Sequence, residues 1–122
     1  MTADPRARRI RAWRRGRWAE RRAALFLRLK GFRILARGYK VPVGEIDIIA
    51  RRGKLLAFVE VKARATLDGA AEALNARQRR RIERAAGWFL AARPEMSGCE
   101  LRYDLMLIAR WRFPVHIGDA WR

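Results

Sequence analysis

The segment Leu55–Ala63 places two charged side chains at the end of an otherwise apolar stretch. It follows a glycine-containing turn at residues 51–54 and is rich in Leu, Phe and Val, which predicts a β-strand. Because successive side chains alternate between the faces of a strand, Glu60 and Lys62 share one face with Phe58. Charged side chains rarely occupy such positions unless they are paired or bind a metal ion. Any fold of this chain must therefore bring an acid and an amine together at the end of a largely apolar strand.

The rest of the chain predicts helices and strands in the order αβββαβ, a sheet with helices packed against it. Helices are expected at residues 17–30 and 76–92, strands at 32–39, 43–50, 55–63 and 101–109, a short last strand at 115–117, and a loop or short helix at 66–73. Gly31 is the expected end of the first helix and Asn75 the expected N-cap of the second. We expect one domain, residues 16–122, after a basic and flexible segment of residues 1–15.

The chain carries 29 Lys and Arg against 12 Asp and Glu, a net charge of +17 in 122 residues. Such a charge favours a polyanionic partner, most simply nucleic acid, because the forked arginine side chain matches phosphate geometry. The arginine-rich N-terminus and Arg77–Arg84 are the expected contacts with the phosphates. A solvated basic surface with no such partner is the alternative.

Cys99 and His116 are the sole members of their residue types. An internal disulfide and a Cys/His zinc site are therefore excluded, and a bound metal would take oxygen ligands, as Mg²⁺ or Mn²⁺ does. No run approaches the roughly 18 apolar residues of a membrane-spanning helix, so no integral membrane segment is expected. The N-terminus also lacks the apolar core of a secretory signal, which makes the cytoplasm the expected location.

The second and third strands are expected to pair as a hairpin. If Ala50 pairs with Leu55, then Asp47 lies opposite Phe58 and becomes a diagonal neighbour of Glu60, roughly 7–8 Å away. Two carboxylates at that separation could bind one divalent ion between them. A one-residue bulge would instead send Asp47 to the opposite face of the sheet and separate the pair.

The same register places Glu45 opposite Glu60, so that three acids gather beside Lys62. Like charges in such positions destabilise a sheet unless a cation lies among them. Two carboxylates that hold Mg²⁺, followed by a lysine, are suited to phosphodiester hydrolysis, in which the metal activates a water that the lysine orients. The alternative is a plain salt bridge between Lys62 and an acid at the edge of the sheet.

Two segments carry a resemblance to a known family: GEIDIIAR at residues 44–51 and FVEVKAR at residues 58–64. They resemble the YraN family of bacterial proteins, which is placed in the restriction-endonuclease-like superfamily with the catalytic pattern PD-(D/E)XK. The resemblance covers roughly residues 16–121 and implies an αβββαβ core with a mixed sheet flanked by helices. Ile46 stands where the pattern has its leading proline, a position that varies widely.

The resemblance also implies roles for individual residues. Asp47, Glu60 and Val61 match the metal ligands, and Lys62 matches the catalytic lysine. Glu20 matches a first-helix acid that supports the metal site in archaeal Holliday-junction resolvases, although it could also simply pair with a nearby arginine.

Gln78 sits where related nucleases carry a helix-borne Gln or Lys near the scissile phosphate, which adds a fifth candidate catalytic residue. The resulting hypothesis is a Mg²⁺-dependent (or Mn²⁺-dependent) DNA endonuclease that acts on branched or recombination-intermediate DNA. Because junction-cutting enzymes generally need two sites, a homodimer is one assembly that it could form. The alternatives are a non-catalytic nucleic-acid-binding protein with a nuclease-like fold, and a basic protein whose first helix meets anionic lipid.

Overall fold

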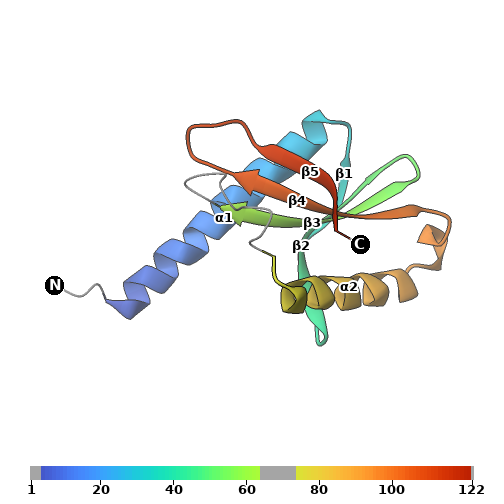
Figure 1. Cartoon of the computed structure of the whole chain (residues 1–122), viewed down its shortest axis with the longest axis horizontal. Helices are drawn as coiled ribbons and strands as arrows, with labels where there is room; N and C mark the ends of the chain where they lie inside the picture. Colours follow the sequence, from blue (N-terminus) through green and yellow to red (C-terminus); the bar gives the residue numbers. More distant parts are fainter. Residues whose placement is uncertain (1–3, 64–73, 122) are drawn as a thin grey trace.

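The computed structural model describes residues 4–63 and 74–121, with the side chains of 10–15 left aside. It contains a five-stranded sheet in the order β1-β2-β3-β4-β5, in which β3 and β4 are parallel and every other pair is antiparallel (Figure 1). The elements are α1 (Pro5–Leu29), β1 (Arg33–Val41), β2 (Gly44–Arg52), β3 (Leu55–Ala63), α2 (Ala76–Ala91), η2 (Pro94–Met96), β4 (Glu100–Ile108) and β5 (Val115–Trp121). The predicted α/β class is confirmed, and the mixed sheet flanked by helices is consistent with a restriction-endonuclease-like core.

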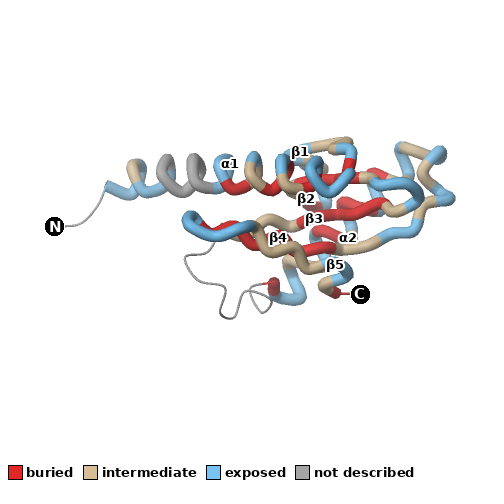
Figure 2. The backbone as a smooth tube through the Cα atoms, turned by 90° about the horizontal axis from the view of Figure 1, so that it is seen from above, coloured by how far each residue is buried: buried red, intermediate tan, exposed pale blue. Residues whose placement is uncertain are grey.

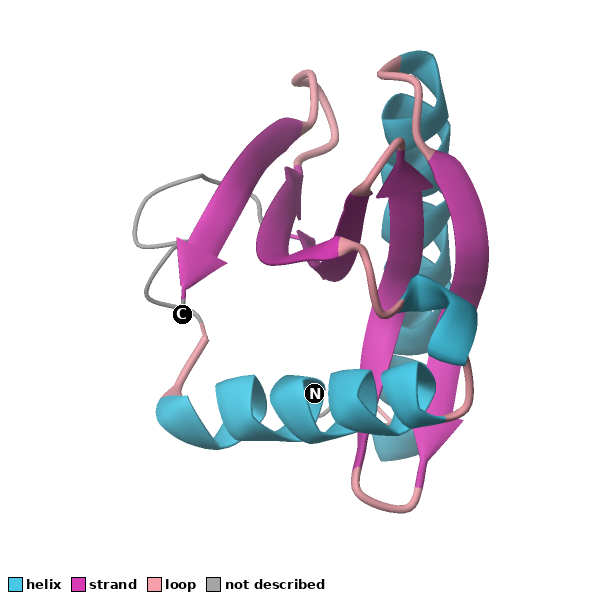
Figure 3. Ribbon diagram, turned by 90° about the vertical axis from the view of Figure 1, so that its right-hand side faces the viewer, coloured by secondary structure: helices cyan, strands magenta, loops and turns pink. Residues whose placement is uncertain are grey.

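The two helices cover opposite faces of the sheet and run in clearly different directions (Figure 3). Ala23 and Leu27 of α1 pack with Val59 on one face, and Phe89 of α2 packs with Phe58 on the other. The fully buried residues follow the central strands in Figure 2. Within the described residues, no helix is both long and apolar enough to cross a membrane.

Most of the expected boundaries lie within two residues of the observed ones. The main difference is α1, which begins at Pro5 instead of residue 17, because the Asp4 carboxylate caps its first turn by accepting from the Arg6 N–H at 3.1 Å. β5 also extends to Trp121 instead of residue 117. The loop or short helix expected at residues 66–73 lies outside the described residues.

The register predicted for the β2–β3 hairpin is wrong by two residues. Ala50 pairs with Ala57 instead of Leu55, and the ladder continues to a pair between Arg52 and Leu55. The reason is the turn: Gly53 adopts a φ of 61°, which permits a two-residue hairpin loop where we expected a longer one. Because a shift of two leaves each side chain on its face, the predicted grouping of acids does not depend on this error.

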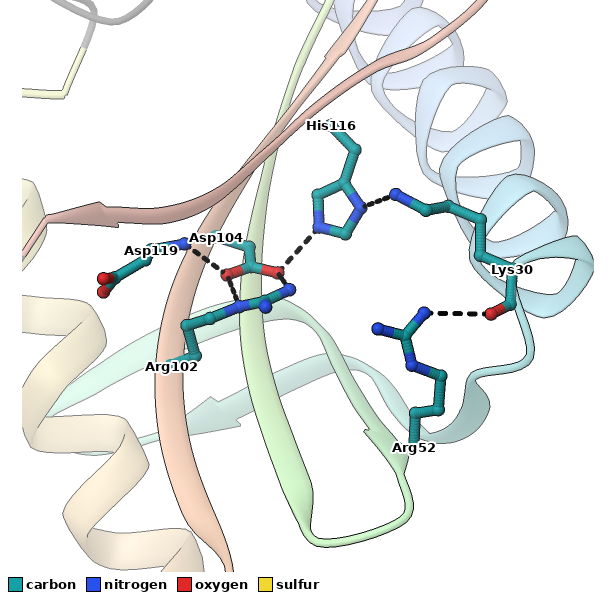
Figure 4. Close-up of polar contacts among 6 residues, drawn as sticks. All are labelled: Lys30, Arg52, Arg102, Asp104, His116 and Asp119. Carbon is teal, nitrogen blue, oxygen red and sulfur yellow. Dashed lines mark hydrogen bonds and ion pairs between the residues drawn. The ribbon is translucent and has the colours of Figure 1, made fainter.

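Asp104 of β4 joins the last two strands to each other and to α1 (Figure 4). Its buried carboxylate accepts two hydrogen bonds from the Arg102 guanidinium, both at 2.8 Å, one from His116 Nε2 at 2.7 Å and one from the Asp119 N–H at 3.0 Å. Lys30 Nζ donates to His116 Nδ1 at 2.6 Å, which leaves the imidazole hydrogen on Nε2, facing Asp104. Hydrogen bonds therefore fix β5 against the sheet at its edge.

This arrangement predicts acid-sensitive stability. Burial alone would raise the pKa of Asp104, but the hydrogen bonds from His116 and Arg102 outweigh it and hold the pKa at about 2, below the ordinary 3.8. A depressed carboxyl pKa stabilises the fold above the unfolded-state pKa, and that contribution disappears as pH falls through the folded-state value. We expect a loss on the order of 2 kcal/mol in the free energy of unfolding between pH 4 and pH 2.

Urea denaturation at several pH values would measure this loss in the wild type, in Asp104→Asn and in the control Asp119→Asn, which keeps the donating backbone N–H. Asp104→Asn should be less stable at pH 6 and should lack most of the acid-dependent loss. Parallel pH profiles for the wild type and Asp104→Asn would contradict this assignment.

Gly44 allows close contact between β2 and α2. A Cβ added there would overlap the Arg81 carbonyl oxygen in α2, and backbone cannot move aside as a flexible side chain can. Gly44→Ala should therefore destabilise the protein by roughly 1–3 kcal/mol. Gly87→Ala, inside α2 with nothing near the added carbon, should stabilise it by up to about 1 kcal/mol. Thermal denaturation of both variants tests this, and equal shifts in Tm would count against the close contact.

Candidate active site

A pocket of about 570 Å³ opens where the side of α1 meets the ends of three strands. It is lined by Gly16, Arg17, Ala19 and Glu20 of α1, Arg37, Gly38 and Lys40 of β1, Glu45, Ile46 and Asp47 of β2, and Val61 and Ala63 of β3. Four of the residues singled out from the sequence, Glu20, Glu45, Asp47 and Val61, are among them.

Asp47 lies at a local irregularity of the sheet. Ile46 and Ile48 would share a face of a regular strand, yet Ile46 packs on the α2 side and Ile48 on the α1 side. The partner strand changes face at the same level, around Gly38, whose φ is 60°. The described β2–β3 pairs also end at Ile48. The Asp47 side chain therefore does not follow the regular alternation between the two faces of the sheet, and its carboxylate lies toward β3.

The carboxylate of Asp47 replaces the missing ladder bond to β3. Its Oδ2 accepts the Val61 N–H at 2.8 Å, and the Asp47 and Glu60 carboxyl groups are hydrogen-bonded to each other, Glu60 donating when protonated. The sequence left open a bulge that would separate the two acids. β2 does change face at this point, but the change brings the two acids together.

Lys62 lies beside Glu60 at the end of β3. Its Nζ is 3.5 Å from Glu60 Oε1, and both side chains are largely buried, with 17% and 16% exposed. The expected acid and amine are therefore adjacent, and Lys62 belongs to the same polar group as Asp47 through Glu60.

Glu20 approaches the acids from α1. Its Oε1 is 3.4 Å from Arg37 Nε of β1, so the arginine pairing left open by the sequence is present. The Glu20 charge also acts on the Asp47 charge across the pocket. Arg37 itself was not among the residues identified from the sequence, because its place depends on the β1–β2 register, which shifts between Ile34 and Ala36.

The acids of this pocket are held in their protonated forms more strongly than free carboxyls. Burial first, and then the charge of Asp47, raise the pKa of Glu60 to about 8, although Lys62 opposes the shift. Burial also raises the pKa of Asp47, against the lowering effect of the Val61 N–H. The pKa of Glu20 is raised by burial and by Asp47, against Arg37. A cation placed among these groups would favour their ionised forms.

The available oxygen ligands are few. They suit a metal ion that keeps several of its waters, such as Mg²⁺ or Mn²⁺, better than one whose ligands all come from the protein. Within the described residues, no group of three or more His, Cys, Asp or Glu side chains could hold a metal ion. Mg²⁺ often binds through one or two carboxylates and keeps several waters, and Asp47 and Glu60 could provide those two. Val61 could contribute only its backbone carbonyl oxygen, and Glu20, paired with Arg37, would act from outside the coordination sphere.

Gln78 and Glu45 were also considered from the sequence, but they do not lie in the group formed by Asp47, Glu60 and Lys62. Gln78 is the third residue of α2, where its Oε1 accepts the Asn75 N–H at 3.3 Å and its own N–H donates to Asn75 Oδ1 at 2.8 Å. This capping box accounts for Gln78, which does not line the pocket. Glu45 lies at the rim, half exposed and 4.0 Å from Lys40 Nζ, and not opposite Glu60 as expected.

Comparison with known proteins agrees with the sequence motifs. The model of "Uncharacterised protein family UPF0102" matches residues 19–108. A UPF0102 protein of Paramagnetospirillum magneticum is 60% identical over 91% of this chain and 89% of its own length. One from Rhodopseudomonas palustris is 55% identical over 98% and 91%, and one from Parvibaculum lavamentivorans is 54% identical over 91% and 84%. The matched region contains Glu20, Asp47, Glu60 and Lys62, and the chain therefore belongs to UPF0102, the YraN family that its two motifs resemble.

Proposed function

We propose that the protein is a Mg²⁺-dependent endonuclease that hydrolyses phosphodiester bonds in DNA, with branched DNA as its expected substrate. The observation that carries the proposal is the grouping of three side chains: Asp47, which lines the pocket and accepts the Val61 N–H at 2.8 Å, and Glu60 and Lys62 beside it, with the Lys62 amine 3.5 Å from Glu60 Oε1. Two acids and a lysine grouped in a largely buried place beside a pocket are the groups that metal-assisted hydrolysis needs.

Asp47, Glu60 and the Val61 carbonyl would hold the metal ion. A bound Mg²⁺ would supply Lewis-acid chemistry, which polarises a phosphoryl oxygen and makes water a better nucleophile at neutral pH. The hydrogen bond from the Val61 N–H fixes Asp47 Oδ2 and with it the plane of the carboxylate. This fixed geometry favours one orientation of the carboxylate before any ligand arrives.

Lys62 would act on the oxygens of the reacting phosphate or on the attacking water. Its amine is held near the acids by Glu60, so it need not be ordered again when substrate binds. A donor fixed in a partly buried site stabilises developing negative charge more strongly than one in bulk water. Glu20 and Arg37 would tune the charge of the pocket from the α1 side.

The surroundings of the pocket suit a polyanion. Arg17 and Arg37 line it from α1 and β1. Gly44, beside the pocket residue Glu45, packs on the Arg81 backbone, so the arginine-rich half of α2 lies near the same end of β2. With a net charge of +17, the molecule would attract the phosphate backbone over long range at low salt.

A protein that only binds nucleic acid has no use for buried acids among its phosphate contacts. Acids at such a place repel the ligand and resist ionisation, and they are costly to bury without a partner. Their presence supports turnover over binding alone. Binding without cleavage of any substrate would nevertheless favour the non-catalytic alternative.

Metal binding should depend on Asp47. We expect the wild type to bind Mn²⁺ at millimolar concentrations or tighter, and Asp47→Asn to lose at least tenfold in affinity, since one of two carboxylate ligands becomes neutral. Electron paramagnetic resonance of free Mn²⁺ gives the affinity directly. Glu45→Gln is the matched control, because Glu45 lies two residues away on the same strand but is 54% exposed at the rim. Equal affinities for Asp47→Asn and the wild type would refute the assigned ligand.

Cleavage should depend on Lys62 without depending on surface lysines. With Mg²⁺ and a four-way DNA junction or linear duplex, Lys62→Met should lower the single-turnover rate by about 100-fold or more, the usual effect of removing one charge-stabilising donor. Lys54→Met is the control, because Lys54 is an exposed lysine of the β2–β3 turn and does not line the pocket.

The same assay identifies contamination and inactivity. Cutting that survives in Asp47→Asn would come from another nuclease. If no DNA or RNA substrate is cut with either metal while binding is intact, the endonuclease proposal fails.

A further inference from the structure

The β4–β5 loop, residues 109–114, exposes two aromatic rings that lie almost entirely outside the core. Trp111 is 87% exposed and Phe113 is 88% exposed, more than any other large apolar side chain among those described. Single exposed apolar residues are ordinary. Two large rings so near each other in one short loop mark an interaction surface. Burial of either would normally contribute about 1.5–3 kcal/mol, so the fold forgoes considerable stability at this loop.

The loop is held in place by α1. Arg22 donates from Nη1 to the Ala109 carbonyl at 3.0 Å and from Nη2 to the Arg112 carbonyl at 3.2 Å. One guanidinium therefore ties both sides of the loop to a long helix. The exposed rings are presented from a fixed base, which lowers the entropy cost of binding through them.

The loop leaves the sheet at the same end as the candidate active site. β3 and β4 are parallel, and Ala63, which lines the pocket, pairs with Ile108, the last residue of β4. The loop thus begins one residue beyond a direct neighbour of the pocket, and it lies alongside α1 in Figure 1. Arg22, which holds the loop, lies two residues from the pocket residue Glu20 on α1.

One arginine lies over the Trp111 ring, and two others belong to the loop or hold it. Arg110 lies over the Trp111 ring at 5.5 Å from its centroid, Arg112 stands between the two aromatic residues, and Arg22 lies over the Trp18 ring at 5.0 Å. Arg22, Arg110 and Arg112 favour an anionic partner. The two exposed aromatic rings favour a partner that also has flat apolar surfaces. A second copy of the chain does not meet this description, because each copy carries +17.

We propose that the β4–β5 loop is a stacking platform for unpaired bases of a nucleic acid, with Trp111 and Phe113 packing on the bases and the adjacent arginines binding the phosphates. This inference rests on the proposed function, in which the same nucleic acid reaches the carboxylate pocket. Bases in a duplex already stack on each other, so the rings bind where bases are unpaired: single strands, forks and junctions. The platform therefore gives the endonuclease a preference for branched over continuous duplex DNA.

Binding of oligonucleotides that carry 2-aminopurine at one unpaired position tests the platform. Stacking on an aromatic ring quenches the fluorescence of this base, and EDTA in the buffer prevents cleavage. The variant is the double substitution Trp111→Ala with Phe113→Ala, and the control is Trp88→Ala, which removes a 48% exposed tryptophan from α2 on the other face of the sheet. Single-stranded, forked and fully paired DNA are compared.

We expect the wild type and Trp88→Ala to quench the unpaired base, and the double variant to lose the quenching. Its affinity for forked and single-stranded DNA should fall roughly tenfold or more, while its affinity for continuous duplex changes less than threefold, because base–aromatic stacking supplies about that factor per ring. An equal loss on all three DNAs would overturn the platform, since the loop would then act through charge alone.

Failure of this inference can be told from failure of the proposed function. If the wild type binds and cuts DNA and the double variant behaves like it, the platform is refuted and the endonuclease stands. If the wild type binds no nucleic acid, both fail. If the double variant loses only binding to vesicles of anionic lipid, the loop is a lipid contact and the platform is refuted.

Discussion

The candidate site depends on one hydrogen bond between two strands. β2 and β3 stop pairing regularly at Ile48 and Val59, and the Asp47 carboxylate takes over by accepting the Val61 N–H. Backbone groups left unpaired in a partly buried sheet are costly, so this bond both completes the sheet and fixes the position of Asp47. Because Val61 lies between Glu60 and Lys62, the bond sets Asp47 beside the acid and the amine that would work with it. The change of face in β2 interrupts the regular pairing with β3, and it also places Asp47 beside Glu60 and Lys62.

The molecule gathers a small group of acids in and beside a pocket that arginine and lysine also line, while the chain as a whole is strongly basic. Asp47, Glu60 and Glu20 are brought close in a protein that otherwise carries 29 Lys and Arg, and each of these three carboxyls has a raised pKa. Such a cluster is unfavourable by itself, and a divalent ion would relieve it while also offsetting the repulsion of a phosphate. The arginines would hold the nucleic acid, and the acids would hold the metal that acts on it. The two proposals therefore depend on each other: the basic surface supplies substrate to a pocket that would otherwise repel it.

The sequence predicted the elements better than the contacts between them. The bounds of the strand Leu55–Ala63 and the Asn75 cap follow from local preferences, and both are confirmed. The hairpin register was wrong because the φ of Gly53 is a property of the folded turn. Gln78 matched a family position, but the capping box with Asn75 already uses its side chain. The approach of Glu20 to Asp47 was expected from resemblance alone, since it requires the helix and the sheet to pack. Asp104 was missed because His116 and Asp119 belong to a strand whose pairing the sequence does not specify, and Arg37 because its partner Glu20 lies on a helix whose packing against the sheet it does not specify.

The central claim is that Asp47 and Glu60 bind one divalent ion between them. Anomalous X-ray diffraction from crystals soaked in Mn²⁺ tests it most directly, because the method locates the metal without any assumption about activity. The account predicts a peak within coordinating distance of both carboxylates and near the Val61 carbonyl oxygen, absent from crystals of Asp47→Asn. Well-diffracting crystals that show no peak in this pocket at millimolar Mn²⁺, or a peak at another place only, would contradict it.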